Sequence, residues 1–301
     1  MTSTPGPLLF PLLALVASLS GALLVAALVG GRHRARGRGR GAAPAPAAAA
    51  ARLGAWWAVA GIAASATWLS DLAVIAVFAA ISALALSEYF ARLPRRRGDA
   101  VLRAACYACV PVQYALVAAE AAGPLTLCLP LVATLALPLL AIAGRDTRKL
   151  VERISEAGWG VLLCVYCVSH VPAVLMLDLP GFAGRAGLPA AFVVIVASAG
   201  ELPRSARGTA GRTDAAVSAA LAAAIGAALY WLTPFAPLAA GAIALLLALL
   251  ALLGRTVLAA VARERDGGAT GADVRAIFGR PAAIAFAAPV WYHLLHVLPG
   301  P

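Results

Sequence analysis

Charged side chains are scarce in this chain of 301 residues. Asp, Glu, Lys and Arg together make up only 12% of it, whereas 62% of the residues are hydrophobic. Soluble domains carry about 25% charged residues and about 45–50% apolar ones, so the composition excludes an ordinary soluble domain. Several apolar runs reach or approach the roughly 20 residues that a helix needs to cross a bilayer. We therefore predict an all-α, polytopic bundle of membrane helices.

Features of zinc sites and of cleaved leaders are also lacking. The five cysteines lie in apolar segments, and their C-x-x-C pairs have no further ligands at zinc spacing, which favours reduced thiols in the core. The first apolar run follows MTSTPG, which contains none of the basic residues that begin a signal peptide. We therefore expect an uncleaved first membrane span.

The apolar runs predict about ten transmembrane helices. Their ranges are roughly 7–29, 53–69, 72–91, 101–119, 124–143, 158–177, 187–200, 215–232, 236–254 and 281–299. The seventh is short for a full crossing, and we expect it to be tilted, broken or buried. Residues 1–52 combine the first span with a flexible linker rich in Arg and Gly and then in Ala and Pro, for which we expect no nucleic-acid partner. Residues 53–301 form the membrane domain.

Basic residues alternate sharply between the predicted loops. Of the 24 Lys and Arg residues, only Arg185 lies on the side of the even-numbered loops. The positive-inside rule therefore predicts that the odd-numbered loops are cytoplasmic and that both termini lie outside. Much of the net charge of +11 then reflects topology, and the same basic face would attract anionic lipid headgroups.

Ionisable residues within the predicted spans are few, and each lies near a span end, where snorkelling to the interface is easy. They are Glu88, His170, His293 and His296. Such residues are functional candidates by default. The simpler interpretation of His170 is an interfacial or capping histidine, and the two C-terminal histidines lack an identifiable third metal ligand. The basic, Gly-rich loop before the last span could bind phosphates or simply be solvated, since it matches neither a Walker A motif nor a dinucleotide fingerprint.

Five stretches carry a family resemblance. They are SEYFARLPRRRGD (87–99), VPVQYALVA (110–118), GRDTRKLVERISEAGWGVLLCVYCVSHVPAVL (144–175), LYWLTPFAPLAA (229–240) and FAAPVWYHL (286–294). Together they resemble the CDP-diacylglycerol synthases, or phosphatidate cytidylyltransferases, of the long bacterial subgroup. The resemblance implies a protein of the bacterial inner membrane that joins CTP to phosphatidate with Mg²⁺, gives CDP-diacylglycerol and pyrophosphate, and forms a homodimer.

The catalytic signature of that family is degraded in this chain. The family's acidic, metal-binding positions correspond to Ala199, Gly279 and Ala282. Positions that would bind substrate phosphate correspond to Arg212, Thr213, Arg263 and Arg280. Divalent cations are held by carboxylates, and none of these three residues has one. We therefore expect no metal ligand at these positions, and we assign no catalytic residue.

Three interpretations stay open. The first is a divergent family member that has lost catalysis, binds phosphatidate or another anionic lipid, or accompanies an active synthase. The second is an active synthase with a rewired metal site, in which Glu264, Asp266 or Asp273 replaces the missing acids. The third is a transporter-like protein without enzymatic activity, although no clear internal repeat supports it.

Overall fold

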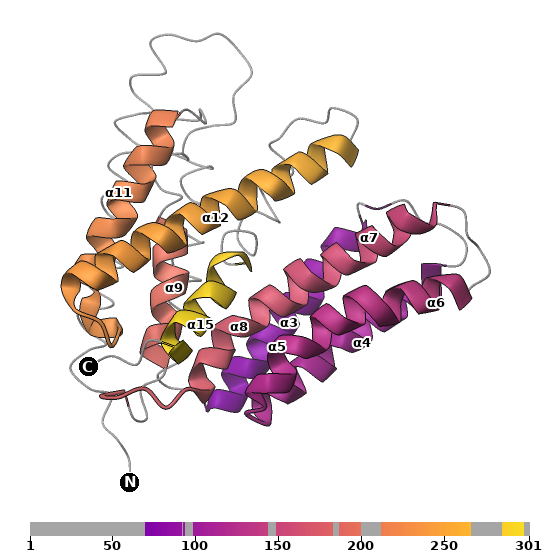
Figure 1. Ribbon diagram of the computed structural model, residues 1–301, viewed down its shortest axis with the longest axis horizontal. Helices are drawn as coiled ribbons and strands as arrows, with labels where there is room; N and C mark the ends of the chain where they lie inside the picture. The colour runs from indigo at the N-terminus through magenta and orange to yellow at the C-terminus, as the bar shows by residue number, and fades with distance from the viewer. Residues whose placement is uncertain are drawn as a thin grey trace. The chain divides into compact units, whose positions relative to one another are not determined.

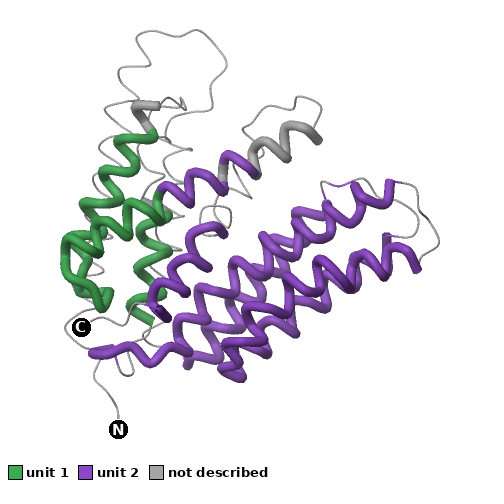
Figure 2. Tube along the Cα trace, in the orientation of Figure 1, with its two compact units in different colours: residues 1–69, 187–248 green, residues 70–186, 249–301 purple. Residues whose placement is uncertain are grey.

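The described helices form two compact units. The computed structural model describes residues 70–91, 93, 99–143, 149–182, 187–199, 212–265 and 285–297. Every regular element in these ranges is helical, which confirms the predicted all-α class. Unit 1 comprises residues 1–69 and 187–248, and unit 2 comprises residues 70–186 and 249–301 (Figure 2). The predicted boundary at residue 52 lies outside the described residues.

Unit 2 is a bundle whose long helices run side by side (Figure 1). Its elements are α3 (Asp71–Ala91), α4 (Asp99–Ala118), α5 (Ala122–Leu131), η1 (Val132–Ala136), α6 (Leu137–Ala143), α7 (Leu150–Val161), η2 (Leu162–Tyr166), α8 (Cys167–Ala173), η3 (Val174–Met176) and α15 (Ala287–Val297). The backbone stays helical through η1 and η2. Consequently α5–η1–α6 and α7–η2–α8–η3 are each one continuous rod, of 22 and 27 residues.

Each rod contains a π-helical turn, in which backbone hydrogen bonds span five residues instead of four. In η1 the N–H of Leu137 donates to the carbonyl of Val132, and in η2 the N–H of Cys167 donates to the carbonyl of Leu162. A π turn therefore accommodates one more residue than the α-helical turn it replaces. The residues that follow it are rotated about the helix axis relative to those before it.

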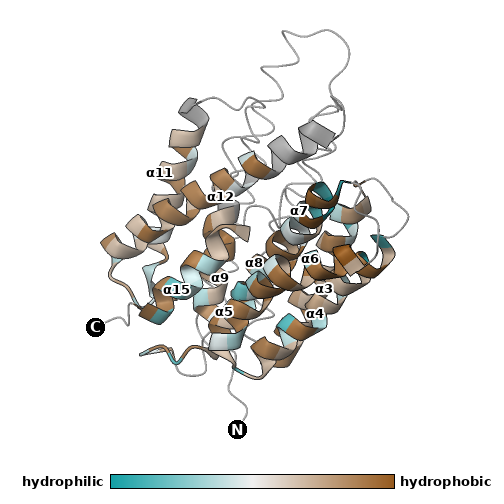
Figure 3. Cartoon of the chain, turned by 45° about the vertical axis from the view of Figure 1, so that its right-hand side comes forward, coloured by the Kyte–Doolittle hydropathy of each residue, from teal (hydrophilic) through white to brown (hydrophobic). Residues whose placement is uncertain are grey.

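The helices of unit 2 bury one side and expose apolar residues on the other. α3 packs against α4 and α8, and α4 packs against α5 and α7. The residues buried completely include Leu86, Cys106 and Leu125. The α5–α6 rod is hydrophobic along most of its length (Figure 3). Its exposed leucines are Leu127, Leu131, Leu135, Leu139 and Leu140. An exposed leucine row on a helix with a buried opposite side suits contact with lipid.

Unit 1 is built on close helix contacts between small residues. It contains α9 (Gly187–Ala199), α11 (Arg212–Ala228), η4 (Tyr230–Leu232) and the start of α12 (Pro237–Arg265), which continues into unit 2. A Cβ placed on Gly226 of α11 would clash with the Cβ of Ala244 of α12. A Cβ on Gly241 would lie 3.1 Å from the Cβ of Ala227. Gly and Ala permit such close approach of membrane helices.

Five of the predicted spans are confirmed as helices long and apolar enough to cross a membrane. They are Asp71–Ala91, Asp99–Ala118, Ala122–Ala143, Leu150–Met176 and Pro237–Gly254. The shorter helices α9, α11 and α15 occupy the seventh, eighth and tenth predicted spans. The first two predicted spans lie outside the described residues. The count of ten and the sidedness of the loops stay predictions.

One predicted boundary is wrong. The sixth span was predicted from residue 158, but α7 begins at Leu150. Three charged residues, Glu152, Arg153 and Glu156, made this stretch resemble a loop. The helix continues through them because Arg153 and Glu156 are buried within unit 2, only 2% and 6% exposed. This early part of α7 is where the polar site of unit 2 lies.

Candidate functional site

A buried ion pair joins the start of α4 to the start of α7. Arg153 Nε donates a hydrogen bond of 2.7 Å to Asp99 Oδ1, and the two side chains are only 1% and 9% exposed. Asp99 is the first residue of α4, where the positive end of the helix macrodipole favours a carboxylate. An unpaired charge at this depth would be costly, so the pair fixes α4 against α7.

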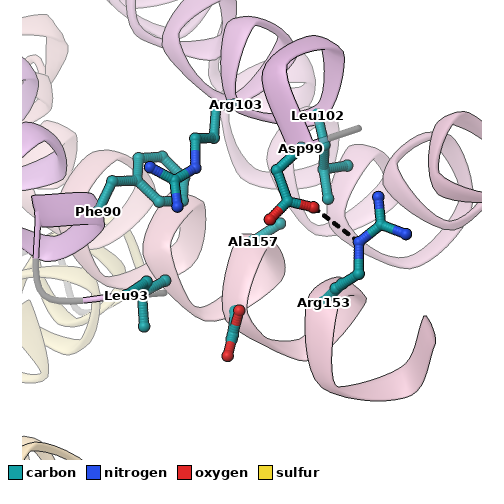
Figure 4. Close-up of a pocket in the computed structure, with 8 residues that line it drawn as sticks. Phe90, Leu93, Asp99, Leu102, Arg103, Arg153 and Ala157 are labelled. Carbon is teal, nitrogen blue, oxygen red and sulfur yellow. Dashed lines mark hydrogen bonds and ion pairs between the residues drawn. The ribbon is translucent and has the colours of Figure 1, made fainter. Parts of the chain in front are cut away.

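The ion pair lines a small cavity between α3, α4 and α7 (Figure 4). The polar walls are Asp99, Arg103, Arg153 and Glu156, and Phe90 and Leu102 are among the apolar ones. The cavity volume is about 10 Å³, the space of roughly one water molecule. A nucleotide therefore does not fit between these side chains in this geometry.

Arg103 brings a second guanidinium group to the cavity. It follows Asp99 by one helical turn on α4, so the two side chains share a helix face. Its Cζ lies 5.2 Å from the centroid of the Phe90 ring, a cation–π contact visible in Figure 4. Phe90 is 5% exposed, whereas Arg103 is half-buried. The aromatic ring of α3 therefore holds the charge of Arg103 at the cavity's rim.

Glu156 brings a second carboxylate, positioned by a close contact between α3 and α7. It follows Arg153 by three residues, so both lie on one face of α7. The Tyr89 hydroxyl donates a hydrogen bond of 3.0 Å to the backbone carbonyl of Glu156. This approach requires glycine at position 160, because a Cβ there would lie 2.8 Å from Tyr89 Cε1. Gly160 and Tyr89 thus set the distance between α3 and α7.

The formal charges of this cluster cancel. Asp99 and Glu156 contribute two negative charges, and Arg103 and Arg153 contribute two positive ones. Mg²⁺ binds through carboxylates and substrate phosphates, but the Asp99 carboxylate is already paired with a guanidinium. Within the described ranges no three His, Cys, Asp or Glu side chains are grouped to hold a metal ion. These residues do not fit a Mg²⁺ site, and they form no strongly basic anion pocket either.

Comparison with known proteins supplies the family. Residues 50–200, half of the chain, match the cytidylyltransferase family. The chain belongs to the cytidylyltransferase family. The match confirms the resemblance seen in the sequence, and the membrane-length helices agree with a phosphatidate cytidylyltransferase-like membrane protein. No curated protein and no solved structure matches the chain.

The region that matches the cytidylyltransferase family contains the whole ion-pair cavity but ends before most of the signature residues. Ala199 is the last residue of α9, while Arg212 and Thr213 begin α11. Arg263 lies in the last turn of α12. The structure describes the backbone but not the side chains at these four positions. Gly279, Arg280 and Ala282 lie outside the described residues, so the roles assigned to the signature residues stay predictions.

The ion-pair cluster of this cytidylyltransferase-family protein is not predicted by its sequence. In the sequence, Arg153 is one of the basic residues assigned to the odd-numbered loops. The sequence does contain a signal for this cluster. Asp99 and Arg103 on α4 are four residues apart, and Arg153 and Glu156 on α7 are three apart, so each helix has an acid and a base on one face. Nothing local showed that the two pairs face each other.

Proposed function

We propose that this protein is a divergent, phosphatidate cytidylyltransferase-like membrane protein that binds anionic phospholipid and no longer transfers cytidylyl groups. One observation carries the proposal. In a chain that belongs to the cytidylyltransferase family, the positions of the family's acids carry Ala199, Gly279 and Ala282, whereas arginines persist at the phosphate-binding positions.

The chemistry explains why this selective loss matters. Nucleotidyl transfer from CTP to phosphatidate builds negative charge on phosphoryl oxygens, and carboxylate-held cations normally neutralise it. Guanidinium groups alone still bind phosphate through paired, charge-assisted hydrogen bonds. A site that keeps Arg263 and Arg280 without acids is therefore suited to holding a phosphomonoester headgroup rather than to transferring a nucleotide.

Lipid binding provides the first test. The purified full-length protein, in nanodiscs of phosphatidylcholine, is titrated with fluorescent phosphatidate and with a fluorescent phosphatidylcholine analogue. We expect selective phosphatidate binding that becomes about 10- to 30-fold weaker when Arg263 and Arg280 are both changed to Ala, at about 1 kcal/mol for each basic residue. Arg185→Ala is the matched control, because Arg185 alone lies on the opposite predicted side. Unchanged affinity of the double variant would contradict the lipid-binding proposal.

Catalysis is tested separately. The same protein receives CTP, phosphatidate and Mg²⁺, and CDP-diacylglycerol and pyrophosphate are both measured. We expect no product above a blank without protein. Turnover by the unmodified chain would instead support an active synthase, in which Glu264, Asp266 or Asp273 would have to supply the missing carboxylate. Loss of that turnover in Glu264→Gln, Asp266→Asn or Asp273→Asn would then identify the replacement.

A further inference from the structure

A chain of buried polar groups crosses unit 2 near the far end of the α7–α8 rod. The amide nitrogen Nε2 of Gln113 donates hydrogen bonds of 3.0 Å to the carbonyl of Leu125 and to Ser169 Oγ. Ser169 Oγ donates in turn to the carbonyl of Tyr166, at 2.8 Å. The same carbonyl contacts Nδ1 of His170 at 2.7 Å. Three of these polar side chains, from Gln113, Ser169 and His170, are 0% exposed.

This arrangement determines which ring nitrogen of His170 carries the proton. A carbonyl oxygen only accepts hydrogen bonds, so Nδ1 of His170 must be the donor toward Tyr166. In the neutral ring, which burial favours, the other nitrogen then presents a lone pair. Nε2 of His170 is therefore fixed as an acceptor, and among the described residues it has no hydrogen-bond partner.

A second buried group without a hydrogen-bond partner in the ranges that the structure describes, the hydroxyl of Tyr292, belongs to the neighbouring ring. The ring of Tyr292, from α15, packs edge-on against the ring of His170 with 5.3 Å between the centroids. Tyr292 is 1% exposed, and its hydroxyl also lacks a hydrogen-bond partner within the described part of the chain. Buried polar groups in proteins are nearly always satisfied by protein or by ordered water. The unsatisfied acceptor of His170 and the unsatisfied donor of Tyr292, on rings in contact, therefore point to a small polar molecule or group that binds both.

The local helix geometry supports a functional role for the polar groups around His170. Tyr166, whose carbonyl accepts both side chains, is the last residue of the π turn η2. Single π turns inside α-helices occur frequently at functional sites. His170 lies 17 residues after Arg153 on the same rod (170 − 153), roughly 25 Å along the axis at 1.5 Å per residue. The polar groups around His170 are therefore separate from the ion-pair cavity.

We propose that His170 and Tyr292 form a binding site for one hydroxyl group. His170 Nε2 accepts the proton of the bound hydroxyl, and the Tyr292 hydroxyl donates its own proton to the bound oxygen. A water molecule can make both of these hydrogen bonds, and so can the hydroxyl of a lipid headgroup.

A thermal test decides whether an occupant exists. If the Tyr292 hydroxyl binds nothing, Tyr292→Phe removes an unsatisfied polar group, and the apparent Tm should stay unchanged or rise. If it binds a hydroxyl, we expect the Tm to fall by about 1–3 °C. Tyr114→Phe is the matched positive control, since the Tyr114 hydroxyl lies 2.7 Å from Ser82 Oγ. Tyr107→Phe is the negative control, because Tyr107 is exposed. A rise or no change for Tyr292→Phe would overturn the proposal.

Solid-state NMR of the unmodified protein identifies the occupant. Histidine labelled with ¹⁵N is studied in vesicles of phosphatidylcholine, which has no hydroxyl in its headgroup, and in vesicles of phosphatidylglycerol, which has two. The His170 signals are assigned by their loss in His170→Gln. Magnetisation transfer to His170 Nε2 from protons at the chemical shift of water, in both vesicles, identifies water. Transfer only in phosphatidylglycerol identifies a lipid hydroxyl, and its absence in both refutes the site.

Discussion

Removing the charge of Asp99 should destabilise unit 2 by a large and calculable amount. Asp99→Asn keeps the side-chain volume and an acceptor for Arg153 Nε but leaves a buried guanidinium without its carboxylate. Breaking one side of a buried ion pair costs about 3–5 kcal/mol. We expect the lower end, because Asn still accepts a hydrogen bond and Glu156 lines the same cavity. At about 2 °C per kcal/mol, the lower slope for large chains, the Tm should fall by about 6 °C.

The protein's own thiols provide the assay for this change. Cys106, Cys109 and Cys164 are free and buried, so a thiol-reactive fluorophore reports their exposure as the protein unfolds in detergent. Glu152→Gln is the matched control on the same helix. It breaks the Lys149–Glu152 contact of 3.2 Å, whose side chains are 67% and 39% exposed, and such a surface pair contributes only about 0–1 kcal/mol.

A paired substitution separates the ion pair from general damage to the site. Replacing both charges by apolar residues of similar size, Asp99→Leu with Arg153→Met, should recover most of the stability lost in Asp99→Asn, because no buried charge is then unpaired. The reasoning is refuted if Asp99→Asn melts within about 1 °C of the unmodified protein, a difference worth at most about 0.5 kcal/mol. It is also refuted if the double variant is as unstable as the single one.

Two further predictions concern helix packing and a buried amide. Gly226→Ala should lower the Tm of unit 1 by several degrees, since overpacking costs about 1–3 kcal/mol and the added Cβ meets Ala244; the fluorescence of Trp231, in the same unit, follows this melting. Gly123→Ala, whose Cβ has open space, should be neutral or slightly stabilising in the thiol assay, which also serves for the second prediction. Gln113→Leu should cost about 1–2 kcal/mol, because it removes both donors to Leu125 and Ser169, and a Tm equal to that of the unmodified protein would contradict those hydrogen bonds.

The positions of long membrane helices followed from the sequence because apolar runs of about 20 residues have few alternatives. The predicted spans 72–91 and 101–119 correspond closely to Asp71–Ala91 and Asp99–Ala118. For α7, whose first two turns contain Glu152, Arg153 and Glu156, the same rule missed the first eight residues of the helix. The buried Arg153 near the start of α7 is paired with Asp99, which lies 54 residues earlier, and hydropathy along the chain contains no information about that contact.

The polar sites were harder to predict for a related physical reason. In helices that are apolar on most sides, sequence periodicity does not show which face is buried. The pairing of His170 with Tyr292 therefore could not be read from the histidines themselves, although both His170 and His293 had been singled out. The π turns are equally invisible, because no residue in Leu162–Tyr166 requires one. Membership of the family, in contrast, was predicted from the sequence alone and is confirmed.

The one extra residue in the π turn η2 rotates all later side chains of the α7–α8 rod about its axis relative to the earlier ones. Arg153 meets Asp99 before it, and His170 meets Tyr292 after it. Each residue of an α-helix turns the chain by about 100°. A chain one residue shorter in Leu162–Tyr166 could form an uninterrupted helix, yet it would turn either the arginine or the histidine away from its partner. The length of this segment is thus constrained by two distant contacts, even where the identity of its apolar residues is not.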